Sequence, residues 1–187
     1  MKIVVPLATG FEEIEAVTVI DILRRAGIEV VIASLASLDS VGDAPVVGAH
    51  SIAIHPTTAI DQLQSDKLDG IVLPGGKQGA YNLRDNPQVI KLIQELNKDQ
   101  KLVGAICAAP IVLEKAGVIK DKQVTCYPGF ESELVSANPT QTACVIDGNI
   151  ITAQGPGISF TFALSIIEIL IGTEKRQEIQ KAMLIPT

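Results

Sequence analysis

The sequence predicts an α/β protein with a mostly parallel sheet and helices on both faces. Short apolar runs typical of buried strands alternate with helix-like segments along the whole chain. Two of these runs, 69–74 and 101–107, lead directly into glycine or small residues, as expected where a strand turns into a helix. The 187 residues, 47% of them hydrophobic, are enough for one compact domain over 1–187 with its own core.

Each expected element in the first half of the chain has a local signal. An apolar run predicts the first strand, an amphipathic pattern ending in glycine predicts the first helix, and a β-branched run predicts the second strand. A less regular segment with two short strands follows. These elements are Ile3–Ala8, Glu12–Ala26 before Gly27, Ile28–Leu35, and Asp39–His55 with strands at Val46–Val47 and Ser51–His55.

The second half continues the alternation. A buried strand enters a glycine pair, an Asn-Pro pair caps a helix, and a strand ending in cysteine precedes a short helix. A further strand, a hairpin with an Asp-Gly turn, and a Gly-Pro-Gly loop before a long helix complete the chain. The ranges are Asp69–Pro74, Asn86–Asn97, Lys101–Cys107, Ala109–Ala116, Gln123–Tyr127, a turn at Asp147-Gly148, and a helix from the 155–157 loop to Gly172.

Composition excludes several function classes. The net charge of −6 argues against nucleic acid and anionic membrane surfaces as partners, since both require a basic face. The longest apolar stretch, Phe160–Ile171, is too short to span a bilayer, and no signal peptide precedes the first strand. Three cysteines without paired spacing fit a reducing, cytoplasmic location. Neither His50 nor His55 has clustered ligand residues nearby in the sequence, so we expect no metal site.

Cys107 is the first candidate for chemistry. It ends the apolar run KLVGAIC and is followed by Ala108, Ala109 and Pro110, so it lies where a strand turns into a helix. The unpaired N–H groups at a helix start favour a thiolate there, which predicts a lowered pKa for this thiol. A lone cysteine can also be a small buried hydrophobe. Its place at the end of the run favours the reactive thiol.

Ligands in parallel sheets bind beyond the carboxyl ends of the strands, where three unusual loops are expected to meet. One loop carries Glu12, Glu13 and Glu15 at the start of the first helix. These residues could simply complement the helix dipole, with Thr9 and Glu12 forming a capping box. Glu15, however, lies among apolar residues, which would raise its pKa and make it a proton shuttle.

Gly75 and Gly76 follow a buried strand directly. The pair could be only a turn, but glycines there also let backbone N–H groups approach a ligand, as an oxyanion site requires.

The motifs GFEEIEAV, RRAGIEV, VLPGG, NLRDNPQV, AICAAP and QGPGISFTFAL occur in this order over almost the whole chain. In this the sequence resembles the ThiJ/PfpI superfamily, in the branch that contains the parkinsonism-associated protein deglycase and its bacterial homologues. The resemblance implies a flavodoxin-like, class I glutamine-amidotransferase-like three-layer α/β/α sandwich that forms a homodimer. It implies that Cys107 is a nucleophilic, peroxide-sensitive cysteine and Glu15 its partner. It also implies that the amides of Gly76 and Ala108 line an anion site.

The sequence departs from relatives at two places. Several relatives place a histidine near the cysteine, in a segment resembling 124–128, where this chain has Tyr127. Members of the protease branch have histidine directly after the cysteine, where this chain has Ala108, which argues against peptidase activity. His50 falls where the animal relative has an arginine near the dimer interface, so we treat His50 as a pocket residue only.

The resulting hypothesis is a cofactor-independent glyoxalase or deglycase that acts on methylglyoxal-type dicarbonyls or their adducts with amines. The Cys107 thiolate would add to the aldehyde, Glu15 would move protons, and backbone amides would hold the oxyanion. Two alternatives use the same thiol. One is an oxidative-stress sensor or chaperone in which Cys107 becomes a sulfinate, and the other is a hydratase for another small electrophile.

Overall fold

The computed structural model describes residues 1–35 and 44–186. Its centre is a seven-stranded sheet with the order β10-β11-β7-β6-β1-β2-β5. Neighbouring strands are parallel except β10, which runs antiparallel to β11, so the mostly parallel sheet is confirmed. The strands are β1 (Lys2–Leu7), β2 (Glu29–Ser34), β5 (Thr58–Ala59), β6 (Gly70–Leu73), β7 (Leu102–Ile106), β10 (Cys144–Asp147) and β11 (Ile150–Ala153).

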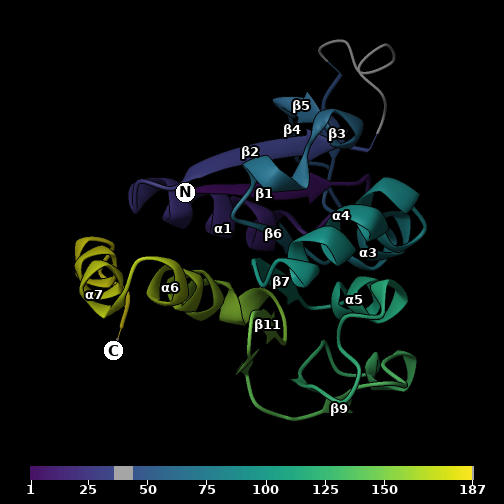
Figure 1. Cartoon of the computed structure of the whole chain (residues 1–187). Coiled ribbons are helices and arrows are strands. Elements are labelled where there is room, and N and C mark those ends of the chain that lie inside the picture. The colour runs from purple at the N-terminus through teal and green to yellow at the C-terminus, as the bar shows by residue number, and fades with distance from the viewer. Residues whose placement is uncertain (36–43, 187) are drawn as a thin grey trace.

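Helices cover the sheet in two groups (Figure 1). In one group α1 (Glu13–Arg25) packs against α6 (Ser159–Leu170), which packs against α7 (Thr173–Ala182). In the other group α3 (Lys77–Arg84), α4 (Pro87–Lys98) and α5 (Pro110–Ala116) pack against one another. The molecule is therefore the flavodoxin-like α/β/α sandwich that was expected.

Local signals account for the start of α4 but not for the start of α1. The Asn86 side chain accepts from Gln88 N at 3.0 Å and Val89 N at 3.1 Å, as predicted for the cap of α4. The capping box at Thr9 and Glu12 is wrong. Helix α1 begins one residue later than expected, and its N-cap residue, Glu12, makes no side-chain cap hydrogen bond.

Two small sheets lie outside the central one. The predicted strand Gln123–Tyr127 shortens to β8 (Gln123–Val124), which pairs with β9 (Asn138–Pro139). The two short strands of the irregular segment are present as β3 (Val46–Val47) and β4 (Ala53–Ile54), while residues 39–43 of that prediction lie outside the described residues. Within the described residues, 3₁₀ turns lie at Ile60–Gln62, Ser65–Lys67, Glu131–Glu133 and Pro156–Ile158.

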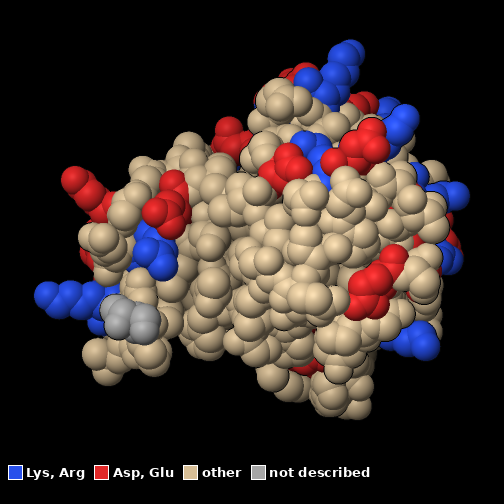
Figure 2. Space-filling view, turned by 90° about the horizontal axis from the view of Figure 1, so that it is seen from below, with Lys and Arg blue, Asp and Glu red and all other residues tan. Residues whose placement is uncertain are grey.

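The core runs along both faces of the central strands. Ile3 of β1, Ile71 of β6, Val103 of β7 and Phe162 of α6 have no exposed surface. No helix in the described residues has both the length and the apolar character needed to cross a bilayer. Figure 2 views the side on which β9 and β11 lie in Figure 1, and the middle of this face carries few charged side chains.

Candidate active site

Cys107 lies on a sharp turn between β7 and α5. Its φ of 64° is in the left-handed region, which is uncommon for a residue with a side chain and is held only where neighbours fix it. Both of its backbone groups are fixed by other segments: the N–H donates to Ala153 O at 2.8 Å, and the carbonyl accepts from Tyr127 N at 2.8 Å. The expected elbow is therefore present, with the cysteine at its apex.

The three loops expected to meet do so. They follow β1, β6 and β7, which are neighbours in the sheet. The backbone N–H of Glu12 donates to Gly75 O at 3.0 Å, which ties the first loop to the second. A Cβ added to Gly75 would lie 2.7 Å from Cys107 Cβ and 2.8 Å from Glu15 Oε2. Only glycine therefore allows this close approach of the second loop to the thiol and the carboxyl.

Glu15 is fully buried, and its environment favours the protonated acid. Burial is the main cause that raises its pKa to about 7, and the charge of Glu12 adds to this. Hydrogen bonding to Gly75 N–H and Cys107 opposes the rise. Oε2 accepts from Gly75 N at 2.6 Å, whereas Oε1 is buried without a hydrogen-bond partner among the described residues. The raised pKa agrees with the expectation from its apolar neighbours.

The pKa of Cys107 differs in direction from the sequence expectation. Burial, the negative charge of Glu15 and the hydrogen bond to Glu15 raise it to about 12. The N–H groups of Gly76 and Ala108 act on the sulfur in the opposite direction but do not outweigh these causes. The expectation of a lowered thiol pKa is therefore wrong for the unliganded protein. At neutral pH the thiol therefore keeps its proton, and the Glu15 carboxyl beside it is close to its own pKa.

The structure places the amides of the three predicted anion-binding residues in two different ways. Gly76 and Ala108 direct their N–H groups at the Cys107 sulfur. The N–H of Gly75 is wrongly assigned to that role, because it is already donated to Glu15. Its role is to fix the carboxyl beside the thiol.

Tyr127 lies beside the elbow, but its backbone makes the contact with Cys107. The side chain is 47% exposed, and its ring lies against Gly155, where an added Cβ would be 3.1 Å from the ring. The 3₁₀ turn Glu131–Glu133, which follows Tyr127 in the chain, contacts α3, since the hydroxyl of Tyr81 donates to Glu133 Oε1 at 2.7 Å. Sequence analysis missed this contact, because no local pattern pairs these two residues.

His50 is not isolated, contrary to the sequence analysis. Its backbone N–H donates to Glu13 Oε1 at 2.6 Å, its Nδ1 lies 2.9 Å from Glu13 Oε2, and Glu12 Oε2 is 3.7 Å away. These contacts, the Glu13 hydrogen bond first, raise the pKa of His50. Burial alone would raise the pKa of Glu13, but its hydrogen bonds with His50 and Ile52 lower it.

The donor atoms of Glu12, Glu13 and His50 lie within 4.8 Å of one another, a spacing that could hold a metal ion. Both oxygens of Glu13 already contact His50 or Ile52, so these contacts hold the turn that contains His50 against the start of α1.

Cys126 and Cys144 are the other thiols, and neither is disulfide-bonded. Burial raises the pKa of Cys126 to about 11, helped by the charge of Glu131. Burial also raises the pKa of Cys144, which is only partly buried. Neither lies on an elbow, so both are ordinary structural thiols.

The structure is an α/β sandwich with a cysteine at a strand-to-helix elbow and a buried carboxyl beside it. These features are those of a protein with a candidate cysteine-dependent active site. A family model described as the DJ-1/PfpI family matches residues 1–169. The chain belongs to this family.

Similar proteins agree along almost the full length. Protein dj-1beta of Drosophila melanogaster is 41% identical over 181 residues, which cover 96% of this chain and 94% of that protein. The glutathione-independent glyoxalase DJR-1.2 of Caenorhabditis elegans is 33% identical over 174 residues, covering 92% and 89%. The crystal structure of Drosophila melanogaster DJ-1beta superposes with a TM-score of 0.93 at 40% identity, covering 100% of this chain and 98% of that one.

Proposed function

We propose that this protein is a cofactor-independent glyoxalase that converts methylglyoxal-type dicarbonyls into 2-hydroxy acids. The observation that carries the proposal is the pair formed by Cys107 and Glu15, a nucleophile beside a buried carboxyl whose pKa is about 7. A group with a pKa near the working pH serves both as acid and as base. The relative named as a glutathione-independent glyoxalase supports the same reaction class.

The first step forms the bond between sulfur and the aldehyde carbon. Because burial and Glu15 raise the pKa of Cys107, the thiolate is formed as the substrate is attacked and not beforehand. The Glu15 carboxylate takes the thiol proton while the S–C bond forms. The same proton then passes to the aldehyde oxygen, which gives a hemithioacetal. The N–H groups of Gly76 and Ala108, which face the sulfur, are placed to stabilise negative charge on that oxygen.

The second step moves a hydrogen between the two carbons of the dicarbonyl. Glu15 removes the proton from the hemithioacetal carbon, and the electron pair moves onto the ketone oxygen to give an enediolate. The proton of the adjacent hydroxyl then passes to that oxygen. Return of a proton to the neighbouring carbon gives a thioester of the 2-hydroxy acid. Water then adds to the thioester carbon and the thiol leaves with a proton. The overall reaction adds one water to methylglyoxal to give lactate, with no external oxidant or reductant.

The adduct of a dicarbonyl with an amine is the second substrate class that we propose. A hemiaminal carbon that releases its amine exposes the same aldehyde to Cys107, so one site serves both reactions. Comparing free methylglyoxal with a methylglyoxal-treated amino acid separates the two. If the rate on the adduct equals the rate of spontaneous aldehyde release, the enzyme acts on the free aldehyde only.

Lactate formation from methylglyoxal without glutathione tests the proposal. Cys107→Ser should abolish turnover, whereas Cys126→Ser, which removes a buried thiol of raised pKa outside the elbow, should retain it. Unchanged turnover in Cys107→Ser would rule out covalent catalysis by this residue.

We also propose that residues 1–187 form one domain and assemble as a cytosolic homodimer. A single core cluster includes residues from Ile3 to Ile179, which supports one domain. Ile14, Val17 and Phe160 are exposed apolar residues on α1 and α6, two helices in contact, which supports an interface there. The three free cysteines fit a reducing compartment. The net charge of −6 supports neither nucleic acid nor an anionic membrane as a partner.

A further inference from the structure

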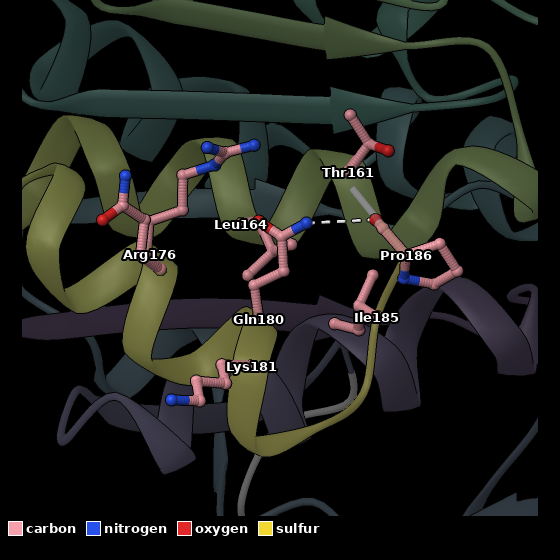
Figure 3. Close-up of a pocket in the computed structure, with 8 residues that line it drawn as sticks. Thr161, Leu164, Arg176, Gln180, Lys181, Ile185 and Pro186 are labelled. Atoms are coloured by element: carbon pink, nitrogen blue, oxygen red, sulfur yellow. Dashed lines mark hydrogen bonds between the residues drawn. The ribbon is translucent and has the colours of Figure 1, made fainter.

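Away from the Cys107 site, a pocket lies between α6, α7 and the C-terminal residues Ile185 and Pro186 (Figure 3). Its volume is about 700 Å³, within the range of small-molecule sites. The C-terminal segment closes one end, because Gln180 Nε2 donates to Pro186 O at 3.0 Å and Ile185 N donates to Gln180 O at 3.0 Å. We call this pocket the α6–α7 groove.

The described residues that line the groove include several hydrogen-bond donors and no carboxylate. Arg176, Lys181 and the amides of Gln177 and Gln180 come from α7, and Leu164, Ile185 and Pro186 supply an apolar part. Such a lining is unexpected in a chain with a net charge of −6. Figure 3 shows Arg176 and Gln180 extending toward Thr161 and Leu164 of α6, while Lys181 points away toward the rim.

Arg176 is the least satisfied of these donors. Its Nε is buried and has no hydrogen-bond partner among the described residues. Glu168 Oε2 lies 3.4 Å from this nitrogen, but the groups are not aligned for a hydrogen bond. The other oxygen of Glu168 accepts from Thr173 Oγ1 at 3.0 Å. A buried donor without an aligned acceptor is costly, and here the ion pair with Glu168 compensates the charge. Because Nε is buried, only the outer nitrogens of the guanidinium can meet a ligand in the groove.

Two further donors have their capacity unused. In the described part of the chain, the side chain of Gln177 makes no hydrogen bond, and the side chain of Lys181 makes neither a hydrogen bond nor an ion pair. An acceptor in the groove would therefore meet the Gln177 amide and the outer nitrogens of a guanidinium whose Nε is ion-paired with Glu168.

We propose that the α6–α7 groove binds a small aliphatic carboxylate. The planar guanidinium of Arg176 matches the two oxygens of a carboxylate, with the Gln177 amide as an added donor. The aliphatic part of the ligand packs on Leu164, Ile185 and Pro186. A fully hydrated ion such as phosphate would leave this apolar part uncovered, which favours a carboxylate with a short chain. The site is separate from the Cys107 site and does not depend on the glyoxalase proposal.

Titration of the ¹⁵N-labelled full chain with sodium hexanoate tests the site. The side-chain amide signals of Gln177 and Gln180 report on the groove directly. 1-Hexanol has the same chain without the charge, and acetate has the charge without the chain. Arg176→Gln removes the guanidinium, and Arg25→Gln is the matched control, because it removes the same charge from α1, where Arg25 pairs with Asp21 at 2.7 Å.

We expect hexanoate to shift the glutamine amides in a saturable way. Hexanol and acetate should each bind the wild-type protein at least about tenfold more weakly than hexanoate does. Arg176→Gln should weaken hexanoate binding by at least about tenfold, and Arg25→Gln should leave it unchanged. If hexanol bound as tightly as hexanoate, the groove would recognise only the aliphatic chain, and the proposal would be overturned. Equal binding by a folded Arg176→Gln protein, or amides that do not respond because a second copy covers the groove, would also overturn it. Melting temperatures of both variants establish that they are folded.

Discussion

Replacing Glu15 by glutamine should stabilise the fold while it removes activity. The glutamine carbonyl can still accept from Gly75 N–H, as Oε2 does at 2.6 Å, but the side chain cannot ionise. Burial raises the pKa of Glu15 from 4.5 to about 7. A difference of about 2.5 pH units corresponds to about 3 kcal/mol by which the fold disfavours the ionised carboxyl. The variant never bears this cost.

The sign of the effect follows from proton binding. Below pH 4.5 the carboxyl is protonated in both the folded and unfolded chains, so wild type and Glu15→Gln differ little in stability. Between pH 4.5 and about 7 the unfolded chain ionises and the folded chain does not, so wild type loses stability as the pH rises. Above about pH 7 the advantage of the variant reaches its full value of about 3 kcal/mol, an upper limit.

Urea unfolding at pH 4, 6 and 8 measures this difference, and lactate formation measures turnover. Turnover should fall about 100-fold or more, the usual contribution of a positioned acid–base group. Glu13→Gln is the matched control on the same helix. Its pKa is lowered, so that variant should lose stability near neutral pH and approach wild type in acid. A stability difference for Glu15→Gln that does not change between pH 4 and 8, or unchanged turnover, would refute the reasoning.

Three further predictions test the geometry of the site. Iodoacetamide labelling of Cys107 should increase through pH 7, because the neighbouring carboxyl ionises there and can accept the thiol proton. Labelling of Cys126 should increase only in strong alkali. Site-resolved mass spectrometry measures both pH profiles, and parallel profiles would contradict the role of Glu15 as the base. Gly75→Ala should destabilise the fold and abolish turnover, because the added Cβ would lie 2.7 Å from the Cβ of Cys107. Gly157→Ala is the control: its added Cβ would have no atom within 4 Å, so this variant should match wild type in melting temperature and turnover rate. The imidazole of His50 should titrate above its ordinary value of about 6.5 in an NMR pH series, because two carboxylates lie beside it, and a lower midpoint would count against those contacts.

The sequence predicted the elements whose signals are local. Asn86 and Pro87 marked the start of α4, and the apolar run ending at Cys107 marked β7 and its elbow. The meeting of the three loops was predictable as well, because strand order in parallel sheets places consecutive carboxyl ends at one edge.

Two helices escaped prediction for a physical reason. Helix α3 contains Gly79 and follows the glycine turn directly, so it reads as an extension of a loop. Helix α7 is polar, and Ile179 is its only buried residue, so it has no apolar stripe. The strand expected at Gln123–Tyr127 ended early because the chain turns there to bond the carbonyl of Cys107.

The electrostatics of the site could not be obtained from sequence spacing. The helix start suggested a thiolate at Cys107, but the larger causes are burial and a carboxylate that comes from another segment. His50 gained its acidic neighbours in the same way, across 37 residues from Glu13. Contacts between distant segments decide such pKa values, and no local pattern encodes them.

The elbow has a consequence for the order in which the molecule assembles. The N–H of Cys107 bonds to Ala153 of β11 and its carbonyl bonds to Tyr127, and both partners come later in the chain than Cys107 itself. Closing contacts between distant segments is slow compared with forming a strand or helix. Until β11 has docked, Cys107 is an ordinary cysteine at the end of a strand, without its fixed turn. The turn that places this thiol beside Glu15 is therefore complete only after β11 has docked.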